Sequence, residues 1–225
     1  MFLTKIINNL LIMKLKINEI YHSIQGESSY AGIPCIFIRL TYCNLRCSYC
    51  DSEYTFYEGK DMSINEILNT IKKYDCNLVE VTGGEPLFQP DCITLLNKLV
   101  NLNYKVLLET SGSLSIEKVP KGVINIIDFK CPSSNMKKKN LWENVNFLKS
   151  NDEIKFIVED KSDYEWAKKK IKKFSLMDKC NILMSPSYKK IEPKKITEWI
   201  LKDNLKVRFQ IQLHKEIWAD KKKGV

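Results

Sequence analysis

Three cysteines within eight residues are the side chains of this sequence whose spacing most directly indicates chemistry. They are Cys43, Cys47 and Cys50, in the pattern C-x3-C-x2-C. An extended residue spans only ~3.3–3.6 Å, and a segment this short therefore brings the three sulfurs into one small region. Clustered thiolates suit a soft metal centre. A [4Fe–4S] cluster normally takes four cysteine ligands, and three would leave one iron open.

A zinc knuckle is the structural alternative for the same cysteines. It would need a fourth ligand at a motif-like spacing, and the two histidines, His22 and His214, are distant in the sequence. An open coordination position separates a catalytic metal site from one that only stabilises a fold. We therefore expect an iron–sulfur cluster with one open iron.

The composition is that of one soluble globular domain. A chain of 225 residues can form one well-buried core and is short for two domains. A hydrophobic content of 44% and a charged content of 28% are ordinary for this class. The other cysteines show no pairing pattern, as expected of small buried side chains in a reducing cytoplasm. They are Cys35, Cys76, Cys92, Cys131 and Cys180.

A net charge of +9 is a feature of many nucleic-acid-binding proteins. Most of the excess lies in lysine runs at residues 137–139, 168–170 and 221–223, which are typical of solvated helix faces and loops. Such runs would also attract an anionic substrate. We therefore expect no nucleic-acid partner, and a zinc-containing nucleic-acid-binding module is the alternative from a different class.

Residues 1–12 are apolar with one lysine. The run is too short and broken for a membrane span, and no small-residue cleavage site follows it. We expect residues 1–12 to be a poorly ordered extension, or to precede a true start at Met13, and residues 13–225 to form the domain. No other stretch approaches transmembrane length, so we expect a soluble, cytoplasmic protein.

From Lys14 onward, runs typical of strands alternate with runs typical of helices. Ser63 followed by Glu66 has the pattern of a capping box, and Pro193 suits the first turn of a helix. We predict strands at residues 35–42, 77–82, 105–110, 123–130, 153–158, 181–185 and 207–213, and helices at residues 63–74, 91–102, 140–149, 162–174 and 193–202.

This alternation predicts an α/β fold with a parallel sheet built from right-handed crossovers. In α/β barrels the chemistry lies at the carboxyl ends of the strands. The cysteine segment follows one predicted strand, and the stretches 83–86, 109–112, 130–134 and 185–186 follow others. Their coincidence at strand ends indicates a single active site.

Two motifs resemble the radical S-adenosylmethionine (SAM) superfamily. They are the cysteine segment and Gly83-Gly84-Glu85-Pro86 after the next strand. Further segments resemble the 7-carboxy-7-deazaguanine synthase family, and this resemblance runs from about Ile17 to the end of the sequence. These segments are YHSIQGE at 21–27, FIRL at 37–40, CDS at 50–52, DFKCPSS at 128–134 and QLHK at 212–215.

The resemblance implies a single-domain partial (β/α) barrel with the helices outside its sheet. It also implies that Cys43, Cys47 and Cys50 hold a [4Fe–4S] cluster whose open iron binds SAM. In this superfamily, an electron from the cluster cleaves SAM to give a 5′-deoxyadenosyl radical. The implied SAM-binding residues are Tyr49, Cys50, Asp51, Gly83, Gly84, Glu85, Glu109, Ser111, Ser133 and Ser134.

Local features support part of this set. Gly83 and Gly84 remove side chains where backbone must approach a ligand, and Pro86 biases Glu85 toward an extended conformation. Carbonyl groups there could point at the SAM ammonium. For Glu109 and the serines, local turn capping is the alternative. For Tyr49, which would pack by the adenine, a surface or core position is the alternative.

The substrate implied by the resemblance is 6-carboxy-5,6,7,8-tetrahydropterin. Arg39 interrupts an apolar strand, where charge is rare unless paired, and its fork matches a carboxylate. We expect it to contact substrate rather than to serve a structural ion pair. The implied substrate-binding residues are Ile24, Gln25, Gly26, Glu27, Arg39, Thr82, His214 and Val225, the last through its terminal carboxylate.

The sequence departs from the family pattern at two positions. Ser52 stands where threonine usually binds Mg²⁺ through its hydroxyl group. Serine keeps the hard oxygen ligand but loses the methyl group that stiffens the rotamer, so we expect a looser Mg²⁺ site. Ser28 stands where glycine is common, which affects the expected conformation of that loop but not its role.

The expected function is that of a carbon–nitrogen lyase that converts the pterin to 7-carboxy-7-deazaguanine, with loss of ammonia, in queuosine biosynthesis. The alternative is another radical SAM enzyme, such as a glycyl-radical activase, which would not need Arg39 or the QGE segment. The resemblance also implies an electron donor such as flavodoxin or ferredoxin, and a homodimer. No membrane partner is expected.

Overall fold

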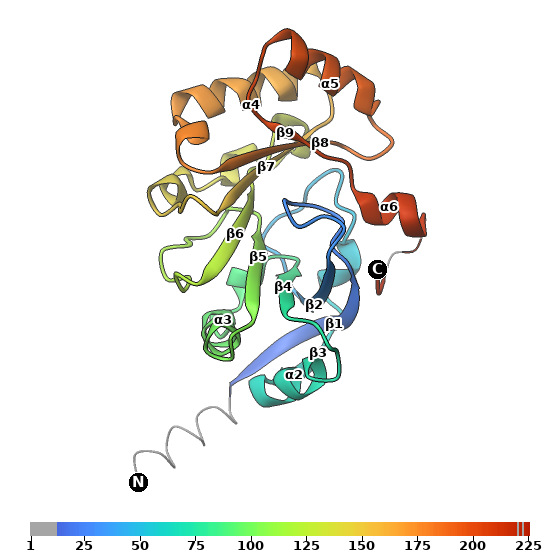
Figure 1. Cartoon of the computed structure of the whole chain (residues 1–225), viewed down its shortest axis with the longest axis vertical. Helices are drawn as coiled ribbons and strands as arrows, with labels where there is room; N and C mark the ends of the chain where they lie inside the picture. Colours follow the sequence, from blue (N-terminus) through green and yellow to red (C-terminus); the bar gives the residue numbers. More distant parts are fainter. Residues whose placement is uncertain (1–12, 220, 222) are drawn as a thin grey trace.

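The computed structural model describes residues 13–219, 221 and 223–225, which form a nine-stranded sheet with helices on its outside (Figure 1). The strand order is β3-β1-β2-β4-β5-β6-β7-β8-β9. The strands are β1 (Lys14–Ile24), β2 (Pro34–Leu40), β3 (Lys60–Ser63), β4 (Leu78–Gly83), β5 (Lys105–Thr110), β6 (Val123–Asp128), β7 (Glu153–Val158), β8 (Asn181–Pro186) and β9 (Arg208–Phe209). The α-helices are α2 (Ile64–Ile71), α3 (Cys92–Asn101), α4 (Lys161–Lys173), α5 (Pro193–Lys202) and α6 (Leu213–Trp218). The predicted partial (β/α) barrel is confirmed.

The sheet is parallel from β2 to β9, but its N-terminal edge is antiparallel. β1 pairs antiparallel with both β2 and β3, whereas each later pair is parallel. The reason is that β1 and β2 are joined by the loop 25–33 with no crossover helix, and a short connection of this kind gives an antiparallel pair. The loop therefore lies at the amino end of β2, where Ile24 faces Pro34.

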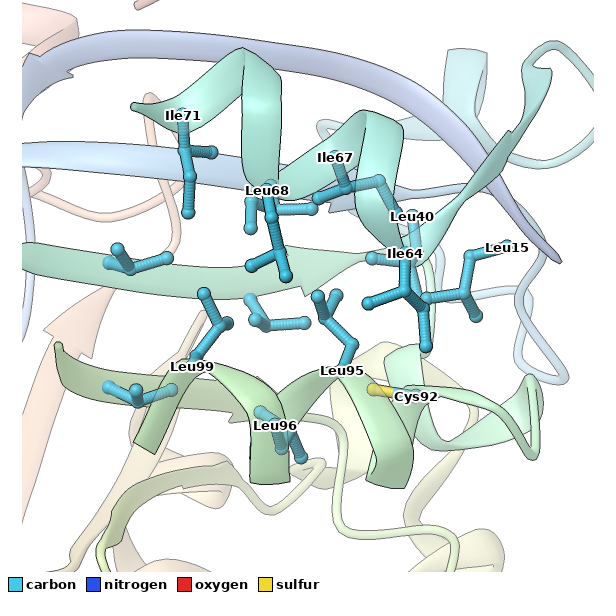
Figure 2. Packing of buried hydrophobic residues seen from close by; sticks show 14 of the residues in the cluster. Leu15, Leu40, Ile64, Ile67, Leu68, Ile71, Cys92, Leu95, Leu96 and Leu99 are labelled. Carbon is cyan, nitrogen blue, oxygen red and sulfur yellow. The ribbon is translucent and has the colours of Figure 1, made fainter. Parts of the chain in front are cut away.

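One hydrophobic core packs α2 and α3 against the sheet. The capping box at the start of α2 is confirmed, because Ser63 Oγ accepts from the Glu66 amide and the Glu66 carboxylate accepts from the Ser63 amide at 2.7 Å. Figure 2 shows Leu95 and Leu99 of α3 pointing toward the apolar side chains of α2, which are Ile64, Ile67, Leu68 and Ile71. Burying each such side chain contributes ~1.5–3 kcal/mol. This core fixes β2 and β4, whose ends carry the cysteine segment and the glycine motif.

A second core packs α4 and α5 against β7 and β8. Phe156 of β7 and Tyr164 of α4 are fully buried in it. Phe129, which follows β6, stacks on Trp142 with 4.4 Å between ring centroids. Aromatic pairs of this kind add ~0.5–1.5 kcal/mol beyond their buried area. This core fixes β6 and β7, which face the interior of the barrel with Asp128 and Lys155.

Most predicted elements agree with the structure to within three residues at either end, but the helix predicted at residues 140–149 is wrong. Only a 3₁₀ turn, Trp142–Asn146, forms there. Asn144 explains the difference, since its side chain accepts from the Ile116 amide at 3.0 Å and donates to the Leu114 carbonyl at 2.9 Å. These bonds to a distant segment replace a local helix.

The strand predicted at residues 207–213 is also largely wrong. The ladder with β8 is limited to Arg208–Phe209. The chain then turns away, because the Leu213 amide donates to the Gly26 carbonyl at 2.9 Å and Leu213 begins α6. Figure 1 shows α6 and the C-terminal segment beside the N-terminal strands rather than in the sheet.

The predictions for residues 1–12 lie outside the described residues. Over the remainder of the chain that the structure describes, no helix is both long enough and apolar enough to cross a membrane.

Candidate active site

The interior of the barrel holds a cavity of about 750 Å³, within the usual range for small-molecule sites. Its walls are inward side chains of the strands, from Arg39 on β2 to Lys155 on β7. The cysteine segment borders it at the carboxyl ends of the strands. The loop 25–33 borders it at the amino ends, where the Ser29 amide donates to Glu153, the first residue of β7, at 3.1 Å. The predicted residues therefore meet in one cavity but enter it from opposite ends.

Cys43, Cys47 and Cys50 all line the cavity as free thiols. Their segment is fixed from behind, because the Ser48 amide donates to the Ser134 carbonyl at 3.1 Å and Ser48 Oγ donates to the Ser133 carbonyl at 2.6 Å. Ser134 Oγ in turn donates to the Cys131 carbonyl. Ser133 and Ser134 therefore brace the cysteine segment and are not among the residues that line the cavity. A contact of these serines with SAM stays a prediction.

Gly83 and Gly84 line the cavity, but they lack side chains because neighbouring backbone of this chain packs against them. Gly83 has φ +148°, a conformation that side chains disfavour, and a Cβ there would lie 2.2 Å from the Leu40 carbonyl oxygen. A Cβ on Gly84 would lie 2.3 Å from the Tyr42 carbonyl oxygen. The missing side chains thus make room for the backbone that leads into the cysteine segment, and the approach of SAM to these glycines stays a prediction.

Glu85 has the extended backbone that Pro86 predicts, with φ −132° and ψ 105°. Its side chain is fully buried, does not line the cavity, and accepts from Thr110 Oγ1 at 2.9 Å and from the Ser111 amide at 2.8 Å. Burial raises the pKa of Glu85, although the bonds from Ser111 oppose this. Its carboxyl group therefore links β4 to the end of β5, and a backbone role toward SAM stays a prediction.

Ile24, Gln25, Gly26 and Glu27 line the amino end of the cavity. Gln25 Nε2 donates to Glu80, and the Glu27 carboxylate pairs with the Lys155 ammonium at 2.7 Å. A Cβ on Gly26 would lie 2.3 Å from Nδ1 of His214, so this glycine gives room to that imidazole.

Ser28, the departure from the family pattern, has φ +65°. This left-handed conformation is the one that glycine adopts most easily. The Ser28 hydroxyl accepts from the Tyr30 amide at 3.1 Å, which compensates for part of the cost. The loop thus keeps a glycine-like conformation with a serine in place.

Arg39 lines the cavity, yet it is also part of an ion pair. Its Nε donates to Glu19 at 2.8 Å and its guanidinium donates to Tyr21 Oη at 2.7 Å. Burial would lower the pKa of Arg39, but Tyr21, Tyr54 and Glu19 raise it above its ordinary value. The ion pair that we expected to be the lesser role is therefore present, and a contact with substrate stays a prediction.

The remaining predicted residues also line the cavity. They are Tyr49, Asp51, Ser52, Thr82, Glu109, Ser111, His214 and Val225. Thr82 Oγ1 donates to Glu109 at 3.1 Å, and Ser52 Oγ donates to Asp51 Oδ1 at the same distance. Burial lowers the pKa of His214, although Glu27 opposes this.

Comparison with known proteins identifies the family. The model of the Radical SAM superfamily matches residues 37–129. The 7-carboxy-7-deazaguanine synthase of Koribacter versatilis is 44% identical over 94% of this chain and 100% of its own length. The enzyme of that name from Chlorobaculum tepidum is 43% identical over 94% of this chain and 97% of its own length. This chain belongs to the 7-carboxy-7-deazaguanine synthase family.

A solved structure shares the fold of this family member. The crystal structure of QueE from Escherichia coli aligns with a TM-score of 0.77 and 22% identity, over 92% of this chain and 98% of that one. At this identity the likeness concerns the fold alone.

Several charged residues of the family member's cavity were missed in the sequence. Lys155, Glu80 and Lys130 are among those that line it. Lys155 and Glu80 each interrupt an apolar run, in EIKFIV and LVEVTG. This is the signal that singled out Arg39, and it would have found them. Lys130 lies in the DFKCPSS segment, and its Nζ donates to Asp128 at 2.8 Å.

The residues of this 7-carboxy-7-deazaguanine synthase family member fit a cluster with SAM. Three free thiols face one cavity, next to Tyr49 Oη and Asp128 Oδ1, two buried polar atoms with no hydrogen-bond partner among the described residues. Buried polar atoms are nearly always bonded, so both atoms could bond a ligand in the cavity. No three His, Cys, Asp or Glu side chains of the described residues converge on a single ion. Cys43, Cys47 and Cys50 would hold a cluster without such convergence, because they would share its irons among them.

Proposed function

We propose that this chain is a radical SAM lyase that converts 6-carboxy-5,6,7,8-tetrahydropterin to 7-carboxy-7-deazaguanine and ammonia, a step of queuosine and deazapurine biosynthesis. The observation that carries the proposal is the 44% identity with a 7-carboxy-7-deazaguanine synthase over that protein's full length. The cavity supports it, because one space holds three thiols at one end and a hydrogen-bonding, charged surface at the other.

Cys43, Cys47 and Cys50 would hold the [4Fe–4S] cluster, and Tyr49, Gly83 and Gly84 would border the SAM beside it. When bound, the cluster and SAM supply the one-electron chemistry that removes a hydrogen atom from carbon 6 of the pterin and later returns one. The chain would hold the pterin with carbon 6 toward this end of the cavity and exclude water from it.

The polar side chains at the other end would bind the pterin. The Arg39 guanidinium would bind the carboxylate, since Glu19 and Tyr21 hold its Nε and Nη2 while Arg39 lines the cavity. Gln25 and Glu27 would bind the guanidine-like edge of the ring. His214 would cover the ring from α6, where Gly26 leaves room for the imidazole.

We propose that Ser52 holds a Mg²⁺ ion that contacts the substrate. Its hydroxyl oxygen is a hard ligand, and Asp51 lies within hydrogen-bond distance of it at 3.1 Å. A Ser52→Ala variant would then need more Mg²⁺ for half-maximal turnover, and Ser52→Thr would need the same or less. Equal Mg²⁺ requirements in all three proteins would contradict this site.

The proposed partners are a low-potential electron donor, such as flavodoxin or ferredoxin, and a second copy of the chain in a homodimer. Support for both comes from the family resemblance. We also propose a cytoplasmic location, which suits free thiols that must remain reduced to bind a cluster.

The test is an anaerobic assay of the reconstituted protein with SAM, Mg²⁺, a reductant and the carboxylated pterin. Mass detection should show the deazapurine, with many turnovers for each SAM, and the Cys47→Ala variant is the matched inactive control. Accumulation of one 5′-deoxyadenosine for each product would contradict the catalytic use of SAM. Absence of the deazapurine with a fully loaded cluster would contradict the proposed function.

A further inference from the structure

Lys155 is a buried lysine at the centre of a group of carboxylates. Its side chain is only 3% exposed, and its ammonium pairs with Glu27 at 2.7 Å, with Glu109, and at 3.8 Å with Asp128. Lysine is almost never buried unless it is paired. Its partners come from the loop 25–33 and from two other strands, so Lys155 links both ends of the cavity wall.

The two closest carboxylates are held side by side. Because Glu27 and Glu109 bind the same nitrogen, their oxygens lie within about two hydrogen-bond lengths of each other. Further donors fix the remaining oxygens, since Gln212 Nε2 donates to Glu27 at 2.8 Å and Thr82 Oγ1 donates to Glu109 at 3.1 Å. The geometry of the pair is therefore set before any ligand enters.

Exposure separates the roles of these three residues. The side chains of Glu27 and Glu109 are 15% and 28% exposed, whereas that of Lys155 is 3% exposed. All three residues line the cavity, and the two glutamates are the more accessible from it. Carboxylate oxygens that face a ligand accept N–H groups and reject carbonyl oxygens.

The charges around Lys155 favour an ionised ammonium on Lys155 and an ionised carboxylate on Glu27. Burial would raise the pKa of Glu27, but Lys155 and His214 lower it. Burial would lower the pKa of Lys155, but Glu109, Glu27 and Asp128 raise it well above 10.5. Glu80, which also faces the cavity, has its pKa raised by burial and by Glu109.

We propose that Lys155 is a positioning residue that determines which ring edge the cavity accepts. It holds the carboxylates of Glu27 and Glu109 side by side, so that together they select a ring with an amino group and a neighbouring N–H over a ring with carbonyl oxygen in the amino position. This inference rests on the proposed function, because it concerns the edge by which that substrate binds.

The test compares two ligands on the reconstituted, SAM-loaded protein without reductant, so that no turnover occurs. Anaerobic calorimetry would give dissociation constants for 6-carboxy-5,6,7,8-tetrahydropterin and for its lumazine counterpart, in which oxygen replaces the amino group. Sites built to bond an N–H group discriminate strongly against analogues that lack it. We expect the wild-type protein to prefer the pterin by about 100-fold or more.

In Lys155→Met we expect this preference to fall at least about tenfold, and in Lys155→Arg, which keeps the charge, to be largely retained. A purely structural lysine would change both affinities together and leave their ratio unchanged. An unchanged ratio in Lys155→Met would therefore overturn the inference and leave the proposed function intact. If the wild-type protein bound neither ligand, both the inference and the proposed function would fail.

A second variant keeps the test decisive if Lys155→Met does not fold. Lys155→Met with Glu109→Gln removes one charge of each sign and restores the charge balance of the buried group. We expect this double variant to load its cluster, as judged by visible absorption, and to lose the preference for the pterin. A wild-type preference in a folded double variant would overturn the inference.

Discussion

Glu19 forms an ion pair with Arg39, which lines the cavity, with 2.8 Å between Oε1 and Nε. Tyr54 donates a hydrogen bond to the same oxygen at 3.0 Å. The other oxygen of Glu19 accepts from the backbone amide of Gly224 at 2.9 Å. One carboxylate therefore holds both the cation proposed to bind substrate and the C-terminal segment that borders the cavity.

Replacing Glu19 by alanine should destabilise the protein and release this segment. Arg39 would be left buried without its charged partner, and breaking such a pair costs about 3 kcal/mol of the free energy of unfolding. Urea denaturation would measure this loss, and limited proteolysis should cut the segment after residue 210 faster. Tyr54→Phe is the matched control, since it removes only one hydrogen bond, worth about 1 kcal/mol. An equal effect of the two variants would contradict the role of the ion pair.

The strands and helices were predictable where a local pattern decides them. Ser63 and Glu66 stand three positions apart before an apolar face of helical period, and the capping box formed as expected. The stretch 140–149 has a helical pattern too, but Asn144 bonds to backbone about 30 residues away. Such tertiary hydrogen bonds leave no trace in a local pattern.

The sequence predicted many of the residues that line the cavity, but not how they are arranged around it. The cysteine segment and the QGE segment were both placed in the site, yet the antiparallel β1 puts the second at the opposite end of the barrel. The pairing of Arg39 with Glu19 was missed because the sequence of one strand does not determine its register with the neighbouring strand. Lys155 carried the same signal as Arg39, a charge within a buried apolar strand, and was overlooked.

Gly26 should not tolerate a side chain, because an added Cβ would lie 2.3 Å from Nδ1 of the His214 imidazole. In Gly26→Ala we expect α6 to shift and the affinity for the carboxylated pterin to fall at least about tenfold, which corresponds to ~1.4 kcal/mol. Anaerobic calorimetry without reductant would measure the affinity. Stability should change little, since the contact lies at the edge of the fold.

A double variant controls for other effects of the alanine. In Gly26→Ala with His214→Ala the contacts with the ring are removed, and only the backbone nitrogen of residue 214, 2.9 Å from the added Cβ, stays close. Adding Gly26→Ala to His214→Ala should therefore cost much less affinity than adding it to the wild-type protein. Two fully additive losses of affinity would mean that the alanine acts elsewhere in the loop, against the contact argued for.

Ser28 offers a test of backbone strain against a hydrogen bond. Ser28→Gly relieves the left-handed conformation, worth ~1–2 kcal/mol, and loses the bond to the Tyr30 amide, worth ~0.5–1.5 kcal/mol. Ser28→Ala loses the bond and keeps the strain. We expect the glycine variant to be more stable than the alanine variant by about 1 kcal/mol in urea denaturation. Equal stability of the two would show that the φ of +65° is not costly.

Glu85 should make the stability of the protein depend on pH. Burial raises its pKa above 4.5, so the native state holds this proton more tightly than the unfolded state. Its contribution to stability is therefore full below pH 4.5 and falls as the pH rises through the native pKa. In Glu85→Gln an amide faces the donors of Thr110 and Ser111, which costs ~1–3 kcal/mol, and the pH-dependent part disappears. Urea denaturation between about pH 4.5 and 8 should show the wild-type free energy of unfolding falling relative to the variant's, and a constant difference would contradict the raised pKa.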